Sequence, residues 1–156
     1  MLIGVMADTH DNLPKVAAAV ELFAARGAQA ILHAGDFVAP FALRLLLRSG
    51  VPLIGVFGNN DGEKEGLRKA CAELHDAPHR FELGGRTIVL AHDPAQLQGA
   101  ASAGADLLVY GHTHQADVRL ASPLVVNPGE AGGWLTGRST VAVLDTETLE
   151  ARILEL

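Results

Sequence analysis

Residues 2–36 carry the pattern that decides the fold, and they read LIGVMADTHDNLPKVAAAVELFAARGAQAILHAGD. The apolar run over residues 2–7 has the length and composition of a buried strand. Asn12 then stands where a helix N-cap is expected, and Gly27 follows the last residue of a stretch with helical apolar spacing. A second apolar run over residues 30–34 completes a strand–helix–strand unit. This unit predicts two parallel strands joined by a right-handed crossover.

The same alternation continues through the first half of the chain, and strands dominate the second half. We expect further helices over residues 40–48, 63–74 and 96–103. Gly84-Gly85 reads as a hairpin turn between two strands. The remaining predicted strands cover residues 53–57, 81–83, 87–91, 107–110, 118–120, 124–126, 140–144 and 151–154. An α/β half followed by a strand-rich half predicts two sheets packed face to face, with helices outside them.

Composition places the chain among single-domain globular proteins. The 156 residues are 49% hydrophobic and 19% charged, which fits one domain over residues 1–156. No apolar run approaches the ~18–20 residues that span a bilayer, so we expect no membrane association. No basic residue precedes Lys15, so the positive flank of a signal peptide is missing, and the single Cys71 fits a reducing compartment. These features predict a cytoplasmic protein.

The charge pattern argues against long nucleic acid as a partner. Lysine and arginine number 12 against 18 aspartate and glutamate residues, which gives a net charge of −6, and the basic residues are dispersed along the chain. A nucleic-acid-binding surface requires a basic patch or stripe. The acidic excess is compatible with bound cations instead.

Polar side chains follow five of the predicted strands at their C-terminal ends. In open α/β sheets this edge is where ligands bind. Glycines at 35, 58 and 111 permit the sharp turns and close backbone approach that such a cluster needs. The five segments are Asp8-Thr9-His10, Gly35-Asp36, Gly58-Asn59-Asn60-Asp61, His92-Asp93 and Gly111-His112-Thr113-His114.

The side chains at these ends predict a pair of metal ions. They offer carboxylate, imidazole and amide ligands, which suit Mn, Fe, Ni, Zn or Co, whereas the only thiol lies within a predicted helix. Seven ligands exceed what one four-coordinate ion can use, but they suit two ions ~3.5–4 Å apart with a bridging carboxylate. Any one of these motifs alone is weak evidence, and their conjunction carries the prediction. The seven are Asp8, His10, Asp36, Asn59, His92, His112 and His114.

This series, together with Asn127-Pro128-Gly129-Glu130, resembles the calcineurin-like metallophosphoesterase superfamily, in particular its small single-domain bacterial and archaeal phosphodiesterases. The resemblance implies a four-layer αββα sandwich of two mixed sheets with flanking helices. It implies two divalent ions, with Mn or Ni the best expectation and Zn, Fe or Co as alternatives. The implied ligands are Asp8, His10 and His114 for the first ion and Asn59, His92 and His112 for the second. Asp36 would bridge both ions.

The implied activity is hydrolysis of small phosphodiesters by attack of a metal-bridged hydroxide. Three positions depart from the common pattern. Asn60 stands where many members carry a histidine that contacts the phosphate, so it can offer only a hydrogen bond. Asp93-Pro94 follows His92 where Gly and His are common, and Glu130 replaces a frequent Ser. With no evident proton donor, aryl diesters should react faster than alkyl diesters.

Other functions stay open at this stage. A phosphomonoesterase could use the same metals, and a scaffold of the retromer-subunit type shares the implied fold with a degraded metal site. The native metal, the physiological substrate and the formation of a homo-oligomer are not determined by the sequence.

Several nearby polar residues have structural interpretations. We expect His33 to support Asp36 as a hydrogen-bond donor, and Asp61 to orient Asn60 or to cap the third helix. His75 and His79 are expected at the surface, flanking the end of that helix.

Overall fold

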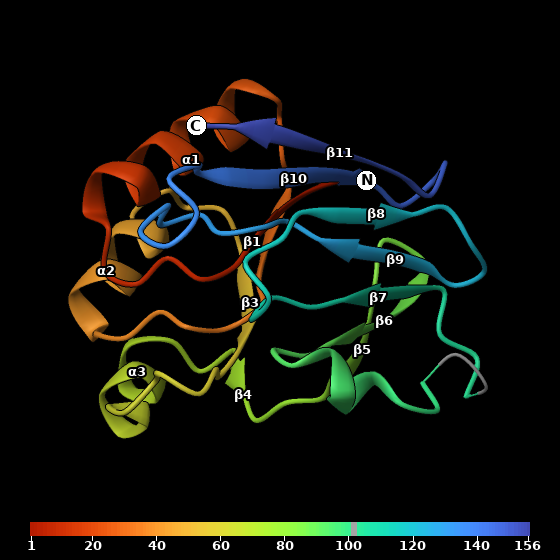
Figure 1. Cartoon of the computed structure of the whole chain (residues 1–156), viewed down its shortest axis with the longest axis horizontal. Helices are drawn as coiled ribbons and strands as arrows, with labels where there is room; N and C mark the ends of the chain where they lie inside the picture. The colour runs from red at the N-terminus through yellow and green to blue at the C-terminus, as the bar shows by residue number, and fades with distance from the viewer. Residues whose placement is uncertain (101–102) are drawn as a thin grey trace.

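The computed structural model describes residues 1–100 and 103–156, and two mixed β-sheets pack face to face in it (Figure 1). The first sheet has the strand order β11-β10-β1-β2-β3-β4. Strands β1 to β4 run parallel, and β10 lies antiparallel between β1 and β11. Their bounds are β1 (Leu2–Met6), β2 (Ala30–His33), β3 (Leu53–Val56), β4 (Leu74–His75), β10 (Thr140–Asp145) and β11 (Glu150–Glu155).

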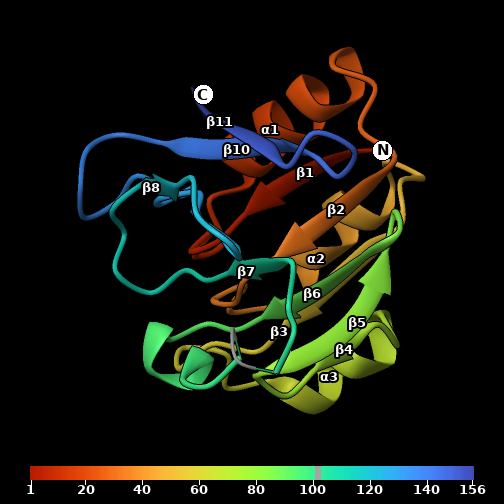
Figure 2. The same cartoon turned by 90° about the vertical axis from the view of Figure 1, so that its right-hand side faces the viewer.

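The second sheet has the strand order β5-β6-β7-β9-β8 and is also mixed. Strands β6, β7 and β9 run parallel, while β5 and β8 are antiparallel edges. Figure 2 shows this sheet across from β1 and β2. The bounds are β5 (His79–Leu83), β6 (Arg86–Leu90), β7 (Leu107–Val109), β8 (Asp117–Arg119) and β9 (Leu124–Asn127).

Three helices cover the outer face of the first sheet: α1 (Leu13–Ala25), α2 (Pro40–Leu47) and α3 (Lys64–Ala70). The sequence signals for α1 are confirmed. The Asn12 side chain accepts a hydrogen bond from the backbone N–H of Lys15, and Gly27 takes a φ of +72° just beyond the helix. Phe23 packs over Gly4 of β1, where a Cβ would lie 2.7 Å from the ring. The crossover from β1 to β2 is therefore tightly packed.

The two sheets share a second apolar core between them. Ile3, Val5 and Leu32 of the first sheet meet Ile88 and Val109 of the second, all fully buried. Each such side chain contributes about 1.5–3 kcal/mol when it leaves water. This double core confirms the predicted four-layer sandwich. The layer outside the second sheet is thin. Among the described residues, the short 3-10 helix η1 (Pro94–Leu97), residues 98–100 and Ala103 lie against β5 and β6 there.

Two predicted helices differ from the structure. The helix expected over residues 63–74 ends at Ala70, and Leu74–His75 form strand β4. Gly55 donates its backbone N–H to the carbonyl of Glu73, so the chain gains a sheet edge and buries Leu74 instead of adding a helical turn. The helix expected over residues 96–103 is confined to η1, and residues 101 and 102 lie outside the described part.

The surface expectation for His75 and His79 is also corrected. Both are half-buried on strands, and their rings stack with centroids 3.7 Å apart.

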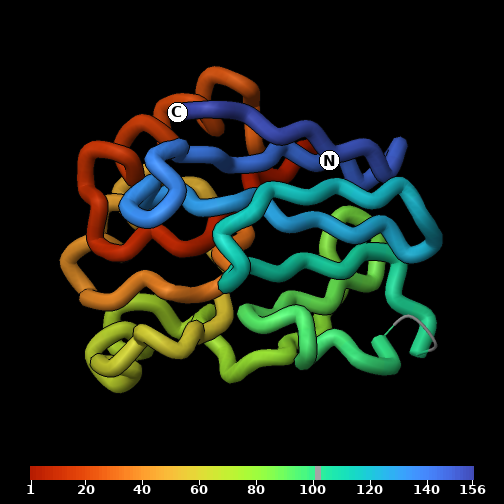
Figure 3. Tube along the Cα trace, in the orientation of Figure 1, coloured from red at the N-terminus to blue at the C-terminus, as the bar shows by residue number. Residues whose placement is uncertain are grey.

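The hairpin at Gly84-Gly85 is confirmed, with φ values of +59° and +74° that glycine adopts readily. The Cα trace in Figure 3 shows cyan β8 below the two blue C-terminal strands, and β8 contacts β11 where the two sheets approach each other. Within the described residues, no helix has the length and apolar character needed to cross a bilayer.

Candidate metal centre

The parallel strands bring the seven predicted ligands to one edge of the sandwich. Asp8, Asp36 and Asn59 follow β1, β2 and β3 of the first sheet. His92 and His112 follow β6 and β7 of the second sheet. Because the two sheets are packed face to face, these strand ends meet across the interface. The ligand atoms form two groups, and the Asp36 carboxylate lies within reach of both.

The first group is built from Asp8, His10 and His114, whose ligand atoms lie close enough together to hold a metal ion. His114 Nε2 lies 3.6 Å from Asp8 Oδ1, and His10 Nε2 lies 3.6 Å from Asp36 Oδ2. Among the described residues, the buried atoms Asp8 Oδ1 and His10 Nε2 have no hydrogen-bond partner. A buried polar atom without a partner costs about 1–3 kcal/mol, so a cation fits this position.

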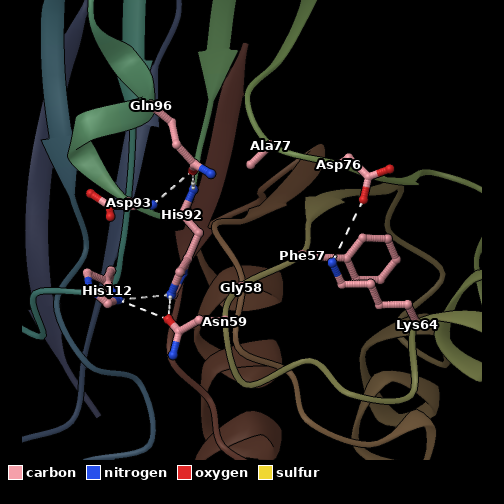
Figure 4. Close-up of a pocket in the computed structure, with 10 residues that line it drawn as sticks. All are labelled: Phe57, Gly58, Asn59, Lys64, Asp76, Ala77, His92, Asp93, Gln96 and His112. Atoms are coloured by element: carbon pink, nitrogen blue, oxygen red, sulfur yellow. Dashed lines mark hydrogen bonds and ion pairs between the residues drawn. The ribbon is translucent and has the colours of Figure 1, made fainter.

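The second group is built from Asn59, His92 and His112. Asn59 Oδ1 lies 2.8 Å from His92 Nε2 and 3.0 Å from His112 Nδ1, and these side chains point toward one another (Figure 4). The other nitrogen of His92, Nδ1, lies 2.8 Å from the carbonyl oxygen of Ala34. A carbonyl only accepts, so Nδ1 carries the proton and Nε2 turns its lone pair toward the cluster. This is the tautomer that a metal ligand needs.

Asp36 lies between the two groups. Its Oδ2 is 3.6 Å from His10 Nε2 and 3.5 Å from His92 Nε2. The side chain is almost fully buried, so its carboxylate faces the cluster and not the solvent. One carboxylate within reach of both groups is the arrangement that a bridging ligand requires.

Backbone strain concentrates in the same residues. Asp8, His10, Asp36, His112 and His114 all have positive φ values, between +43° and +66°. Non-glycine residues rarely adopt this region, although Asp and His tolerate it better than most. Each such residue costs on the order of 1 kcal/mol or more, and clustering of this strain is typical of functional sites.

The predicted close approach is confirmed at all three glycines, and a Cβ on Gly58 would clash with the Asp36 carboxylate. A Cβ on Gly111 would lie 2.7 Å from the Cβ of Ala7 and 3.0 Å from Asp8 Oδ2. A Cβ on Gly35 would lie 2.6 Å from His92 Nδ1, and Gly35 also has a φ of +95°. Larger residues at either position would push the ligand candidates apart.

Asp61 organises the loop that carries Asp36, a role that the sequence reading missed. Asp61 Oδ2 accepts hydrogen bonds from the backbone N–H groups of Asp36 at 3.0 Å and Gly58 at 2.7 Å. Asp61 Oδ1 accepts another from Val38 at 2.7 Å. Among the described residues Asp61 makes no hydrogen bond to Asn60. It does not cap α3 either, since Glu63 occupies the N-cap without a side-chain bond. Burial raises the pKa of Asp61 even though these three hydrogen bonds lower it.

Asn60 contacts Asp36 directly. Its backbone N–H donates to Asp36 Oδ1 at 2.9 Å, and its side-chain Nδ2 donates to Oδ2 at 2.7 Å. The structure thus places the amide against the carboxylate shared by the two groups.

His33 acts on Asp36 through Thr9, and not by the direct bond that we expected. The backbone N–H of Gly35 donates to His33 Nδ1 at 3.2 Å, so the ring proton lies on Nε2, 3.1 Å from Thr9 Oγ1. The Thr9 hydroxyl in turn donates to the carbonyl of Asp36 at 3.2 Å. Complete burial holds the pKa of His33 well below its usual value, which keeps this neutral tautomer.

The electrostatics of the cluster favour cation binding. Burial, together with the nearby Asp36 carboxylate, raises the pKa of Asp8 to about 8. Burial also lowers the pKa of His92, so its imidazole tends to be neutral. A cation between these groups would stabilise the ionised carboxylates and use the free imidazole lone pairs.

Glu130 lies behind His114, and the sequence predicted no role for it. Burial raises the pKa of Glu130, but hydrogen bonds from Leu135 and Thr136 outweigh this and hold the pKa below its usual value. Its side chain is therefore a carboxylate.

A pocket of about 280 Å³ opens beside the second group. Asn59, His92 and His112 line one side of it, and Phe57 lines the other, as Figure 4 shows. Lys64 also lies on that other side, with its Nζ 3.9 Å from Asp76. The pocket is large enough to take one substituent of a small ester next to the ligand cluster.

The sequence profile of the calcineurin-like phosphoesterase superfamily domain matches residues 1–149. The chain belongs to this superfamily. The structural expectations drawn from the resemblance therefore have an independent basis, and the strand-end cluster lies within the matched region.

Similar proteins agree with this assignment. A phosphodiesterase of Methanocaldococcus jannaschii is 35% identical over 165 residues, covering 100% of this chain and 99% of that protein. A probable metallophosphoesterase of Methanothermobacter thermautotrophicus is 34% identical, covering 99% and 92%. A solved archaeal phosphodiesterase superposes with a TM-score of 0.90 at 36% identity over the full length of both chains. The E. coli phosphoesterase YfcE, at 23% identity and a TM-score of 0.69, covers 99% of this chain and 98% of its own and shares the fold.

Proposed function

We propose that this phosphoesterase hydrolyses small phosphodiesters with the help of two divalent cations, manganese or nickel being the best candidates. The observation that carries the proposal is the pair of ligand groups that share Asp36. The first cation would be held by Asp8, His10 and His114, and the second by Asn59, His92 and His112. The enzyme would act in the cytoplasm, where a free thiol such as that of Cys71 stays reduced.

The chain's own residues would orient the reaction around these cations. When bound, the cations would lower the pKa of an attacking water and neutralise charge on the phosphoryl oxygens. Asp36 would fix the position of the two metal sites relative to each other, since its carboxylate reaches both groups. Asn60 would hold Asp36 through its two hydrogen bonds and would offer its amide as a hydrogen-bond donor to the substrate.

The pocket supports a diester as the substrate. A phosphodiester has a second substituent, and the pocket beside Asn59, His92 and His112 can take it. Among the described residues that line this pocket, Lys64 is the one lysine or arginine, its Nζ is already near Asp76, and Asp93 adds a negative charge at the wall. Both esters would be attracted by the proposed cations, but the protein side chains at this wall give a second negative charge on the ester no further partner, which favours the monoanionic diester.

The test is hydrolysis by metal-stripped protein after addition of Mn²⁺ or Ni²⁺. We expect bis(4-nitrophenyl) phosphate to react faster than 4-nitrophenyl phosphate. Asp36→Ala and His112→Ala should each reduce the rate of hydrolysis by more than roughly 10–100-fold. That range is the usual loss when a residue that only hydrogen-bonds to a metal ligand is removed. His79→Ala is the matched control, because it removes a half-buried imidazole outside the cluster, and it should keep full activity.

Two outcomes would contradict the proposal. Faster hydrolysis of the monoester would assign a phosphomonoesterase instead. Tight metal binding without hydrolysis of either ester would assign a non-catalytic role.

A further inference from the structure

The carboxylate of Glu130 lies behind His114, on the side away from the first ligand group. Its Oε1 is 3.3 Å from His114 Nδ1, while the other ring nitrogen, Nε2, lies 3.6 Å from Asp8 Oδ1. The side chain of Glu130 is 0% exposed. The imidazole therefore stands between a carboxylate of the cluster and a carboxylate outside it.

Glu130 is held rigidly in this position. The backbone N–H of Leu135 donates to Oε1 at 2.9 Å, and Thr136 donates to Oε2 from its backbone at 2.9 Å and from its hydroxyl at 2.8 Å. The carbonyl of Glu130 accepts from the N–H of Thr140 at the start of β10. Both ends of the residue are thus fixed, and the carboxylate cannot turn away from the ring without losing these bonds.

The turn before Glu130 also braces the loop that carries His114. Asn127 Nδ2 donates to the carbonyl of Gly111 at 3.2 Å and to Thr113 Oγ1 at 2.8 Å, and Asn127 Oδ1 accepts from the N–H of Gly129. One short segment therefore holds the backbone around His114 and supplies the carboxylate that faces its ring.

The carboxylate of Glu130, 3.3 Å from His114 Nδ1, favours a proton on that ring nitrogen. In the described part of the chain, His114 Nδ1 has no hydrogen bond of ordinary geometry, and the carboxylate of Glu130 is the charged group facing it. A proton on Nδ1 is stabilised by that carboxylate, and it leaves the lone pair on Nε2 facing Asp8. His92 reaches the same tautomer through the carbonyl of Ala34.

We propose that Glu130 is a positioning residue that fixes the tautomer and the orientation of the His114 ring for the first cation. The inference rests on the proposed function, in which His114 is a ligand. A carboxylate behind a metal-bound imidazole raises the basicity of the ligand, and loss of such a partner weakens metal binding by about 10–100-fold.

The rival explanation is that Glu130 only holds the loop over residues 131–137. Glu130→Gln separates the two roles. Gln carries one oxygen and one NH₂ group, so it must either present a donor to His114 Nδ1 or lose an acceptor for Thr136. Thr136→Val is the matched control, because it removes the hydroxyl contacts with Glu130 Oε2 and with the backbone of Arg138 and leaves the carboxylate beside the ring.

The first experiment reads the tautomer in the metal-free protein by nitrogen-15 NMR of the imidazoles, at about pH 8, where histidine is mostly neutral. We expect His114 to be protonated on Nδ1 in the native protein and in Thr136→Val, and the Nε2–H form to gain population in Glu130→Gln. A native His114 protonated on Nε2 would overturn the proposal, whether or not any variant folds.

The second experiment measures Mn²⁺ affinity by electron paramagnetic resonance of the free ion. Glu130→Gln should bind one of two Mn²⁺ ions about 10–100-fold more weakly, and Thr136→Val should match the native protein. Equal losses in both variants, or none in Glu130→Gln, would overturn the proposal. Failure of the native protein to bind Mn²⁺ or hydrolyse diesters would refute the proposed function, while the tautomer measurement would still judge Glu130.

Discussion

Removing the Asp61 carboxylate should test how the Asp36 loop is held. In Asp61→Ala, the backbone N–H groups of Asp36, Gly58 and Val38 lose their acceptor. The first two bonds are buried, and each unsatisfied buried donor costs about 1–3 kcal/mol, or about 2–6 kcal/mol for both. Removal of a buried carboxyl with a raised pKa offsets part of this loss. We therefore expect the free energy of unfolding to fall by about 3 kcal/mol.

This loss is large enough to measure and small enough to leave the variant folded under native conditions. Domains have about 5–15 kcal/mol of stability, and 1 kcal/mol shifts the melting temperature by about 2–4 °C at this chain length. Urea unfolding with a chelator present should give the free-energy change, and thermal melting should show a decrease of roughly 6–12 °C. Because the same bonds place Asp36, the rise in melting temperature on adding Mn²⁺ should also be smaller than in the native protein.

Asp106→Ala is the matched control for this variant. Within the described part of the chain, Asp106 Oδ2 accepts one hydrogen bond, from the backbone N–H of Thr87 at 2.8 Å, at the end of the second sheet away from the cluster. We expect Asp106→Ala to lose about 1 kcal/mol and to keep the full effect of Mn²⁺. If Asp61→Ala lost no more stability than this control and kept its response to Mn²⁺, the assigned role of Asp61 would be refuted.

Three further predictions concern the cluster. Folding raises the pKa of Asp8 from 3.8 to about 8, so between these pH values the folded protein binds a proton that the unfolded chain has lost. The metal-free protein should therefore be more stable near pH 4 and lose stability as the pH rises toward 8. Urea unfolding across this range should show the slope, and Asp8→Asn should flatten it. Asn60→His should add a proton donor and narrow the ratio of aryl to alkyl diester turnover; an unchanged ratio would argue against any contact of this position with the leaving group. Gly111→Ala should lose about 1–3 kcal/mol by crowding Ala7, whereas Gly62→Ala, which meets open space, should stay within about 0.5 kcal/mol in the same unfolding assay.

Local patterns predicted most of the fold. The N-cap at Asn12, the glycine at Gly27 and the turn at Gly84-Gly85 depend on the conformational preferences of those residues, and the structure confirms all three. Strand β4 was missed because residues 71–75 have no strand pattern of their own. The backbone of β3 offers them hydrogen bonds, and a sheet edge provided by a distant segment outweighs a local helical preference.

Some residues of the candidate site could likewise be predicted from the sequence, and others could not. The seven ligand candidates could be found in the sequence, because ligand chemistry belongs to the side chain and parallel strands end at a common edge. The places of Asp61, Glu130 and His33 could not, because their partners are mostly backbone N–H and carbonyl groups, which every residue type carries. Chain composition and strand order therefore determined which chemistry gathers at the sheet edge. Only the tertiary structure decided which carboxylates face the cluster and which hold it in place, because a hydrogen bond depends on where the backbone passes.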